Sequence, residues 1–298
     1  MSFQIKTEIF RRMVCLFAVL LVFLGTVGCN GNGNINGDGP DPTVTKEEVI
    51  SALNAGSRKV NSFFSWSGIT FTNERYPNGQ SGKATLVYKR PDKLYLLFSV
   101  GGQNIILMKT DGEYVDIYDF ENNEGRMASV DNIRKFSDMF GGFRPDFLTK
   151  SMGLDIIEPS QTTMKIDGGK YVLTVKASDG NTRRLYISHN PFRLVRQDVF
   201  AGDADSNEPE ISVEYFEHSE FNTEGTGETV SLPTNIIIKV PSKKLTLDLK
   251  HNPKDFKIND ERAVSLQTDG TWRIRWKQDV PVVRLRDDGD WERIDTQE

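Results

Sequence analysis

The feature that most constrains this fold is a hairpin-like stretch that is apolar on both of its sides. Residues 93–108 read KLYLLFSVGGQNIILM, two short strand-like runs joined by Gly101 and Gly102. A strand with one solvent-exposed side alternates apolar and polar residues, because successive side chains point to opposite faces of a sheet. Here apolar residues fill both sets of positions, so both sides of the hairpin must be covered. What covers the second side decides what the sheet can bind.

Similar runs predict an antiparallel sheet along most of the chain. From Trp66 onward, short β-rich runs are separated by NG, RPD, GG and TDG turn signals. Residues 236–238 are again apolar on both sides, whereas KLTLDLK, residues 244–250, alternates and predicts one dry face. Further strands are expected in LDIIE, TMKIDG, KYVLTVKA, TRRLYIS, FRLVRQDVF and EISVEYFEH. No βαβ rhythm is present, so the class is mainly antiparallel β with a few helices.

Two helical segments are expected to pack on this sheet. Thr45 and Glu48 form a capping-box pattern, followed by an apolar stripe of Ile50, Leu53, Val60 and Phe64. Residues 131–152 form a second helical insert that Asp131 would cap. This insert contains a candidate lid with Gly141-Gly142 as its hinge, or else a helix pair that closes the barrel end; the lid residues are Met139, Phe140, Phe143, Phe147 and Met152.

The N-terminus has the pattern of a bacterial lipoprotein signal peptide over residues 1–28. Lys6, Arg11 and Arg12 precede an uncharged run from Met13 to Val27, which at about 15 residues is short for a membrane-spanning helix. The run ends in Thr26-Val27-Gly28-Cys29, which resembles a lipobox with Thr in place of the usual Leu. Cys29 is then the expected site of diacylglycerol attachment. An ordinary secretory signal with an incidental cysteine is the alternative.

Residues 29–42 are expected to form the lipidated tether. The segment is rich in Gly and Asn and ends in Pro40-Asp41-Pro42, which indicates a flexible linker with a stiffer end. Loss of residues 1–28 takes the formal net charge of the chain from −5 to −7. An acidic body does not bind anionic lipid by itself, so the acyl anchor would hold it at the membrane. The acidic balance also weighs against nucleic acid as a partner.

Motifs for catalysis and for cofactors are missing from the sequence. There is no GxSxG elbow, no Walker loop and no GxGxxG between a strand and a helix. The histidines, His189, His218 and His251, are isolated and have no metal-ligand spacing. We therefore expect neither an enzyme nor a bound metal or cofactor, apart from the covalent anchor.

The two-sided apolar strands allow two interpretations. In one, the sheet curls on itself and the apolar side chains form an ordinary core. In the other, the sheet curls incompletely and leaves an apolar groove for a lipid chain. The candidate lining residues of that groove are Leu94, Leu96, Phe98, Ile105, Leu107, Ile236 and Ile238.

Several segments together resemble the LolA/LolB-like family of lipoprotein-localisation carriers and receptors. They are the opening helix, WSGITFT, KRPDKLYLLF, ILMKTDGEYVDIYD, the helical insert, LPTNIIIKVP and LTLDLKHNPKDFKINDE, within residues 43–262. The resemblance implies an incomplete, open β-barrel of about eleven antiparallel strands with helices plugging the concave face. Residues 263–298 would be a C-terminal extension, in which TWRIRWK and VVRLR predict a hairpin.

The resemblance also implies a function. Members of the family bind acyl chains of lipids or lipoproteins in the concavity, without a covalent step. The expected protein is a lipid-anchored envelope lipoprotein, on the outer membrane and facing the periplasm, that takes part in lipid or lipoprotein transfer. The alternative is an anchored β scaffold that binds a protein or an envelope polymer on its surface.

Overall fold

A computed structural model describes residues 39–298, except residues 75, 136–150, 177–179, 203–207 and 295–298. Residues 39–298 form one compact unit. The expected signal peptide, Cys29 and most of the tether lie outside the described residues. The same holds for four of the five candidate lid residues, Met139, Phe140, Phe143 and Phe147.

The chain of this unit begins with helix α2 (Lys46–Arg58), which starts at the predicted capping box. The Glu48 carboxylate accepts a hydrogen bond from the Thr45 backbone N–H at 2.7 Å, and the Thr45 hydroxyl accepts one from the Glu48 N–H at 3.2 Å. The predicted apolar stripe was too long, because the helix ends at Arg58. Val60 lies beyond it and Phe64 belongs to the first strand.

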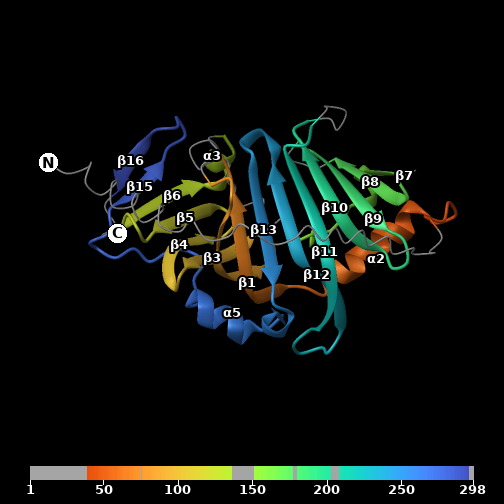
Figure 1. Cartoon of the computed structure of the whole chain (residues 1–298), viewed down its shortest axis with the longest axis horizontal. Coiled ribbons are helices and arrows are strands. Elements are labelled where there is room, and N and C mark those ends of the chain that lie inside the picture. Colours follow the sequence, from red (N-terminus) through yellow and green to blue (C-terminus); the bar gives the residue numbers. More distant parts are fainter. Residues whose placement is uncertain (1–38, 75, 136–150, 177–179, 203–207, 295–298) are drawn as a thin grey trace, which may run out of the picture. The chain divides into compact units, whose positions relative to one another are not determined.

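The described part of the chain contains sixteen strands in one sheet (Figure 1). The first seven are β1 (Ser62–Thr72), β2 (Gln80–Lys89), β3 (Lys93–Val100), β4 (Gln103–Thr110), β5 (Tyr114–Asp119), β6 (Glu124–Ser129) and β7 (Thr162–Asp167). The next six are β8 (Lys170–Lys176), β9 (Thr182–Ser188), β10 (Arg193–Phe200), β11 (Ile211–Asn222), β12 (Thr229–Val240) and β13 (Leu245–His251). The last three are β14 (Lys257–Ile258), β15 (Val282–Leu285) and β16 (Trp291–Ile294).

The order across the sheet is β16-β15-β6-β5-β4-β3-β2-β1-β13-β12-β11-β10-β9-β8-β7, with β14 paired to β1. Neighbours are antiparallel, except that β15 runs parallel to β6. The edge strands β16 and β7 do not pair, so the sheet is an open barrel, as expected. It exceeds the expected eleven strands partly because β15 and β16, from the C-terminal extension, continue it beyond β6.

One face of the sheet, here called the inner face, bears α2 and the largest core. Val49 and Ile50 of α2 pack against Tyr171 and Leu173 of β8 and Leu185 of β9. The rest of the inner face forms one continuous apolar cluster that extends from β6 through β1 to β10. The alternation predicted for residues 244–250 is confirmed, since Leu245, Leu247 and Leu249 are buried in this cluster.

The C-terminal extension covers the second side of the two-sided hairpin. Helix α5 (Glu261–Thr268) packs on the outer face, where its Val264 contacts a cluster of Phe64, Val87 and Tyr95. Trp272 packs against the same cluster. A helix and the segment that follows it thus cover apolar residues on the outer side of β2–β4. Figure 1 shows the position of α5 beside the sheet.

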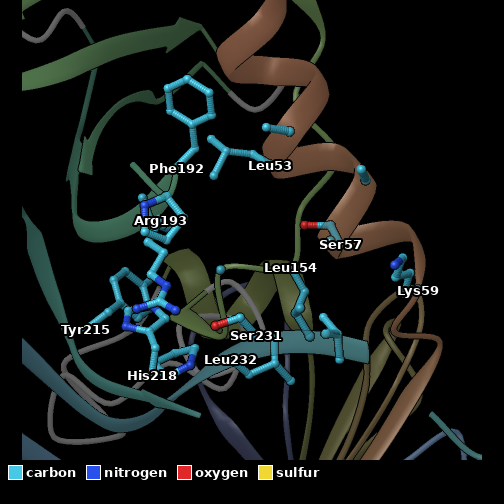
Figure 2. Close-up of a pocket in the computed structure, with 18 of the residues that line it drawn as sticks. Leu53, Ser57, Lys59, Leu154, Phe192, Arg193, Tyr215, His218, Ser231 and Leu232 are labelled. Atoms are coloured by element: carbon cyan, nitrogen blue, oxygen red, sulfur yellow. The ribbon is translucent and has the colours of Figure 1, made fainter. Parts of the chain in front are cut away.

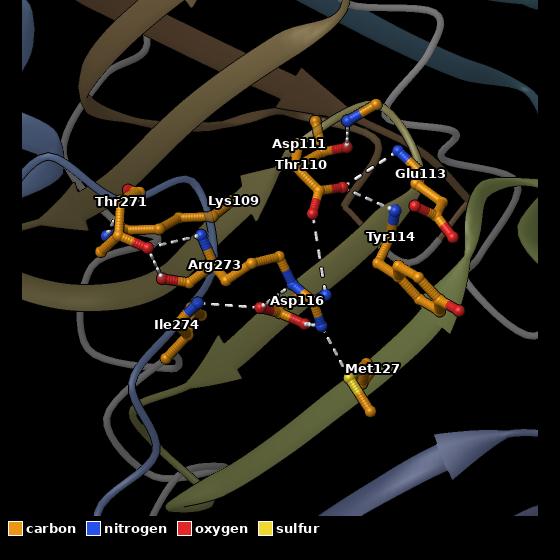
Figure 3. Close-up of polar contacts among 11 residues, drawn as sticks. Lys109, Thr110, Asp111, Glu113, Tyr114, Asp116, Met127, Thr271, Arg273 and Ile274 are labelled. Carbon is orange, nitrogen blue, oxygen red and sulfur yellow. Dashed lines mark hydrogen bonds and ion pairs between the residues drawn. The ribbon is translucent and has the colours of Figure 1, made fainter.

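An ion pair fixes this extension to the sheet (Figure 3). Arg273 donates to both carboxylate oxygens of Asp116 at 2.8 Å, and the Ile274 backbone N–H donates to Asp116 as well, at 2.8 Å. The Asp116 side chain is only 1% exposed. The Lys109 ammonium group donates to the carbonyl oxygens of Thr268 and Thr271 at 3.1 and 3.3 Å.

Three local predictions were wrong. TWRIRWK, residues 271–277, is not a strand; VVRLR instead pairs with residues 291–294 to form the β15–β16 hairpin. LDIIE, residues 154–158, is an irregular segment across the inner face. There the Asn54 side chain donates to the Ile157 carbonyl oxygen and accepts from the Ile157 N–H, both at 2.9 Å. Helix α3 (Val130–Lys135) begins before Asp131, and Ser129 accepts the Asn132 N–H.

Candidate functional site

The inner face holds a cavity of about 350 Å³ between the second half of α2 and strands β10–β12 (Figure 2). Its walls come from four parts of the chain: residues 52–59, residues 152–154, the β9–β10 turn with the start of β10, and facing parts of β11 and β12. A volume of this size lies at the lower end of the range for small-molecule sites. These segments are distant in sequence and are brought together by the helix crossing the sheet.

One side of the cavity is apolar. Leu53 of α2, Leu154, Phe192, Leu194 and Leu232 line it. Figure 2 shows Leu53 and Phe192 at one end and Leu232 at the other, with Leu154 between the helix and the sheet. A hydrocarbon chain placed against such a surface would gain about 0.8 kcal/mol for each CH2 group that it buries.

A glycine allows the irregular segment to lie close against the strands. Gly153 has a φ of +67°, and a Cβ there would meet Leu194 Cδ2 at 3.0 Å and the Tyr215 ring at 3.6 Å. Any other residue would therefore be strained and would push this segment away from β10 and β11. The close approach places Met152 and Leu154 in the cavity wall.

The opposite side of the cavity is polar. Arg193, Tyr215 and His218 lie together there, next to each other in Figure 2. Burial lowers the pKa of His218, the charge of Arg193 lowers it further, and a hydrogen bond to the Leu194 backbone opposes the shift. Burial raises the pKa of Tyr215 well above its usual value, and Asp155 adds to the rise. At neutral pH the site thus presents one guanidinium cation, a neutral phenol and an imidazole that is held neutral.

Two polar groups of this wall have no hydrogen-bond partner among the described residues. They are the Tyr215 hydroxyl and the Arg193 Nε, and both atoms are buried. Tyr215 as a whole is 3% exposed. Nearby, Arg183 is paired with Asp155 through one terminal nitrogen, while its buried Nε is also without a partner. Buried polar groups in proteins are nearly always hydrogen-bonded to protein, water or ligand, so the two groups of this wall, which have no partner among the described residues, can take one from a bound molecule.

The candidate groove residues from the sequence lie elsewhere. Four of them, Leu94, Leu96, Ile236 and Ile238, are buried in the inner-face core, against which Phe98 packs partly buried. Leu107 pairs with Leu97 and packs on the outer face with the α5 cluster. Ile105 sits where the β3–β4 register shifts. None of the seven lines the cavity; of the candidate lid residues, Met152 does.

Sequence reasoning did not identify the polar wall. Arg193, Tyr215 and His218 belong to two runs, FRLVRQDVF and EISVEYFEH, that were recognised only as strands. A usable signal was the alternation Ile211, Val213, Tyr215, which places a tyrosine among inward-facing apolar residues. An inward tyrosine needs a partner for its hydroxyl, and that need points to a site.

His251 is a buried polar residue outside the cavity. Its Nδ1 lies 3.0 Å from the Ser65 hydroxyl and 2.7 Å from the Ser67 hydroxyl, next to Phe63 and Phe256. Burial lowers the pKa of His251 to about 4, so the ring is neutral and Nδ1 can accept from the serines. His189 contacts the Tyr171 hydroxyl at 3.2 Å. No group of three or more His, Cys, Asp or Glu side chains suited to a metal ion occurs among the described residues.

Comparison with known proteins identifies the fold. No family model and no curated protein matches the sequence. Among solved structures, a DUF1329 family protein from Desulfovibrio piger matches with a TM-score of 0.52 at 8% identity, over 76% of this chain and 97% of that one. A LolA superfamily protein from Nitrosomonas europaea matches with a TM-score of 0.50 at 12% identity, over 76% and 100%. The fold is LolA-like.

A third solved structure agrees with this assignment. A domain described as an outer membrane lipoprotein-sorting protein, from Vibrio parahaemolyticus, matches with a TM-score of 0.51 at 9% identity, over 72% of this chain and 92% of that one. The predicted resemblance in fold is therefore confirmed. In the described part of the chain, no helix combines the length and the hydropathy needed to cross a bilayer.

Proposed function

We propose that this protein binds an acyl chain of a lipid or lipoprotein in the cavity between α2 and β10–β12, without a catalytic step. The observation that carries the proposal is a cavity with an apolar wall on the inner face of a LolA-like sheet. Burial of each CH2 group contributes about 0.8 kcal/mol. Every CH2 group held in the cavity therefore offsets the free-energy cost of taking that group out of a bilayer.

The proposal includes the place of the protein in the cell. A diacylglycerol on Cys29 would anchor it in the envelope, with the outer membrane and the periplasmic side as the site of action. The tether of residues 29–42, as a random coil, would span on the order of 20 Å, enough to hold the domain just off the membrane surface. An anchored receptor or a stationary step in lipid or lipoprotein transfer fits this arrangement better than a soluble shuttle.

The first test is extraction of bound lipid. The chain from residue 30 onward, which keeps the whole compact unit 39–298, is purified from a bacterial host without detergent and extracted with organic solvent. Mass spectrometry of the extract should show acyl lipid in a fixed ratio to protein. A lipid-free extract, together with no binding of added fatty acid, would instead favour the surface-scaffold alternative.

The cavity can be filled without disturbing the fold. Gly56 lines the cavity from α2, and a Cβ at this position would meet no atom within 4 Å. Gly56→Leu should therefore place its side chain in free space and strengthen the helix by roughly 0.5–1 kcal/mol. We expect Gly56→Leu to lower the amount of bound lipid several-fold while the melting temperature stays equal or rises.

The matched control is Gly56→Ala, which gives the same helix benefit with little added volume. It should stabilise the protein and leave the bound lipid nearly unchanged. Equal lipid content in the wild type, Gly56→Ala and Gly56→Leu would place the acyl chain outside this cavity.

A further inference from the structure

We propose that the ligand of this cavity is an amphiphile with an anionic head group, whose oxygen atoms contact Arg193 and the Tyr215 hydroxyl. The inference rests on the proposed acyl-binding function and adds the chemistry of the head. Two head groups have this chemistry, a carboxylate and a phosphate, each carried on an alkyl chain.

The first observation is an unpaired cation in the wall of the cavity. Arg193 forms no ion pair with any described carboxylate, and its buried Nε has no hydrogen-bond partner among the described residues. Its neighbours in this wall are His218, which is held neutral, and Tyr215, a neutral phenol. A guanidinium group in such a place binds carboxylate or phosphate oxygens through two parallel hydrogen bonds.

The second observation is independent of the charge. The Tyr215 hydroxyl is fully buried and has no partner among the described residues. A phenol that remains protonated is a donor, because burial raises its pKa. A ligand oxygen between Tyr215 and Arg193 would satisfy both groups at once, and an anionic oxygen satisfies them better than a neutral one.

The other charges around the cavity are paired or lie at its rim. Asp155, the carboxylate whose charge acts on Tyr215, is paired with Arg183. Glu220 also lines the cavity, but it is exposed at the rim. Lys59 lines the cavity too and is engaged by Glu228 at 3.6 Å and by the Thr229 carbonyl at 3.3 Å. The cation therefore lies beside Tyr215 and His218, between the apolar Leu53 and Phe192 at one end of the cavity and Leu232 at the other (Figure 2). The head and the chain of an amphiphile would thus contact different parts of the same cavity.

The test compares ligands that share one alkyl chain. Dodecanoate, dodecyl phosphate and dodecanol are titrated against the chain from residue 30 onward, below their aggregation limits, with displacement of a fluorescent fatty acid as the readout. At least one of the two anionic ligands should bind roughly tenfold or more tightly than dodecanol, as expected for a charge-assisted hydrogen bond. The stronger of the two anions distinguishes a fatty-acid head from a phosphate head.

Three variants assign the effect to residues. Arg193→Gln and Tyr215→Phe should each lower the affinity for the anionic ligand several-fold more than the affinity for dodecanol, and so reduce the preference for the anion. Tyr215→Phe should also melt at the same or a higher temperature, because it removes a hydroxyl that has no partner. Arg58→Gln is the matched control: it removes the same charge from the other flank of α2, where Arg58 lines a separate cavity of about 210 Å³.

The failures of the two proposals can be told apart. If none of the three ligands binds, the acyl-binding function itself is wrong. If dodecanol binds as tightly as both anions, or if Arg193→Gln leaves the preference intact, the head-group inference is overturned while acyl binding stands. If Arg58→Gln loses the preference to the same extent, the effect comes from the net charge of the protein and not from a contact with Arg193. That result would also overturn the inference.

Discussion

At the scale of single residues, His251 makes the stability of this protein depend on pH. Its pKa is lowered to about 4 in the fold, against an ordinary value near 6.5. Between pH 6.5 and pH 4 the His251 ring is therefore protonated in the unfolded chain but neutral in the folded chain. The neutral ring contributes stability that is fully present above pH 6.5 and is lost as the pH falls toward 4, by at most about 3 kcal/mol.

This effect can be measured by urea unfolding at pH 7.5 and pH 5. The wild type should lose about 2 kcal/mol of unfolding free energy between the two values through this residue. His251→Gln should be less stable at pH 7.5 but should show a much smaller loss on acidification. His189→Gln, at a histidine outside the Ser65–Ser67 contact, controls for the type of substitution. Parallel losses in the wild type and His251→Gln would contradict the assignment.

Residue-scale prediction from the sequence succeeded where the interaction is local. The Thr45–Glu48 capping box needs only residues three apart, and the structure contains both of its hydrogen bonds. His251 looked equally isolated in the sequence, yet its partners Ser65 and Ser67 come from a strand more than 180 positions away. Arg193 and Tyr215 were missed for the same reason, because the cavity exists only once α2 crosses the sheet.

At the scale of elements, the two-sided hairpin correctly predicted that its second face must be covered. The covering element was not recognised, because α5 buries little of its own surface: Val264 is buried whereas Leu266 is 68% exposed. The alternation of TWRIRWK favoured a strand, since Trp272, Ile274 and Trp276 share one parity. In the fold this segment is instead held by the side chain of Asp116, and such a contact has no local signature.

The Asp116–Arg273 pair gives a test of how the extension is held. Arg273→Ala would leave the carboxylate of Asp116, which is 1% exposed, without its charged partner. Breaking a buried pair on one side costs about 3–5 kcal/mol, and the partial exposure of Arg273 places the expected loss near the lower value. Chemical unfolding should show this loss, together with easier proteolysis of the last 30 or so residues.

A second arginine of the extension is the control. Arg284 lies 3.9 Å from Glu292, and both side chains are more than 40% exposed. Arg284→Ala should therefore cost less than about 1 kcal/mol. Equal losses in the two variants would show that Asp116 is not the residue that holds the extension in place.

At the scale of the whole molecule, the sheet is open and its inner face is only partly filled. The apolar runs predicted the sheet and its antiparallel order, and the resemblance in fold is confirmed. The same runs could not show where the free space would be. Leu94, Leu96, Ile236 and Ile238 belong to one core cluster. The cavity lies further along the sheet, between α2, residues 152–154 and strands β10–β12.

The proposed anchor belongs to this scale as well, because it decides whether an acidic domain stays at a membrane. Without residues 1–28 the chain has a formal net charge of −7, which opposes binding to anionic lipid. Cys29→Ser should therefore move the protein from the membrane to the soluble fraction of cells, and should remove incorporation of a labelled fatty acid. Cys15→Ser changes the only other cysteine and should leave both unchanged. If Cys29→Ser stays in the membrane fraction as the wild type does, something other than an acyl chain retains the domain. The tethered-receptor proposal would then fail, even if the cavity binds lipid.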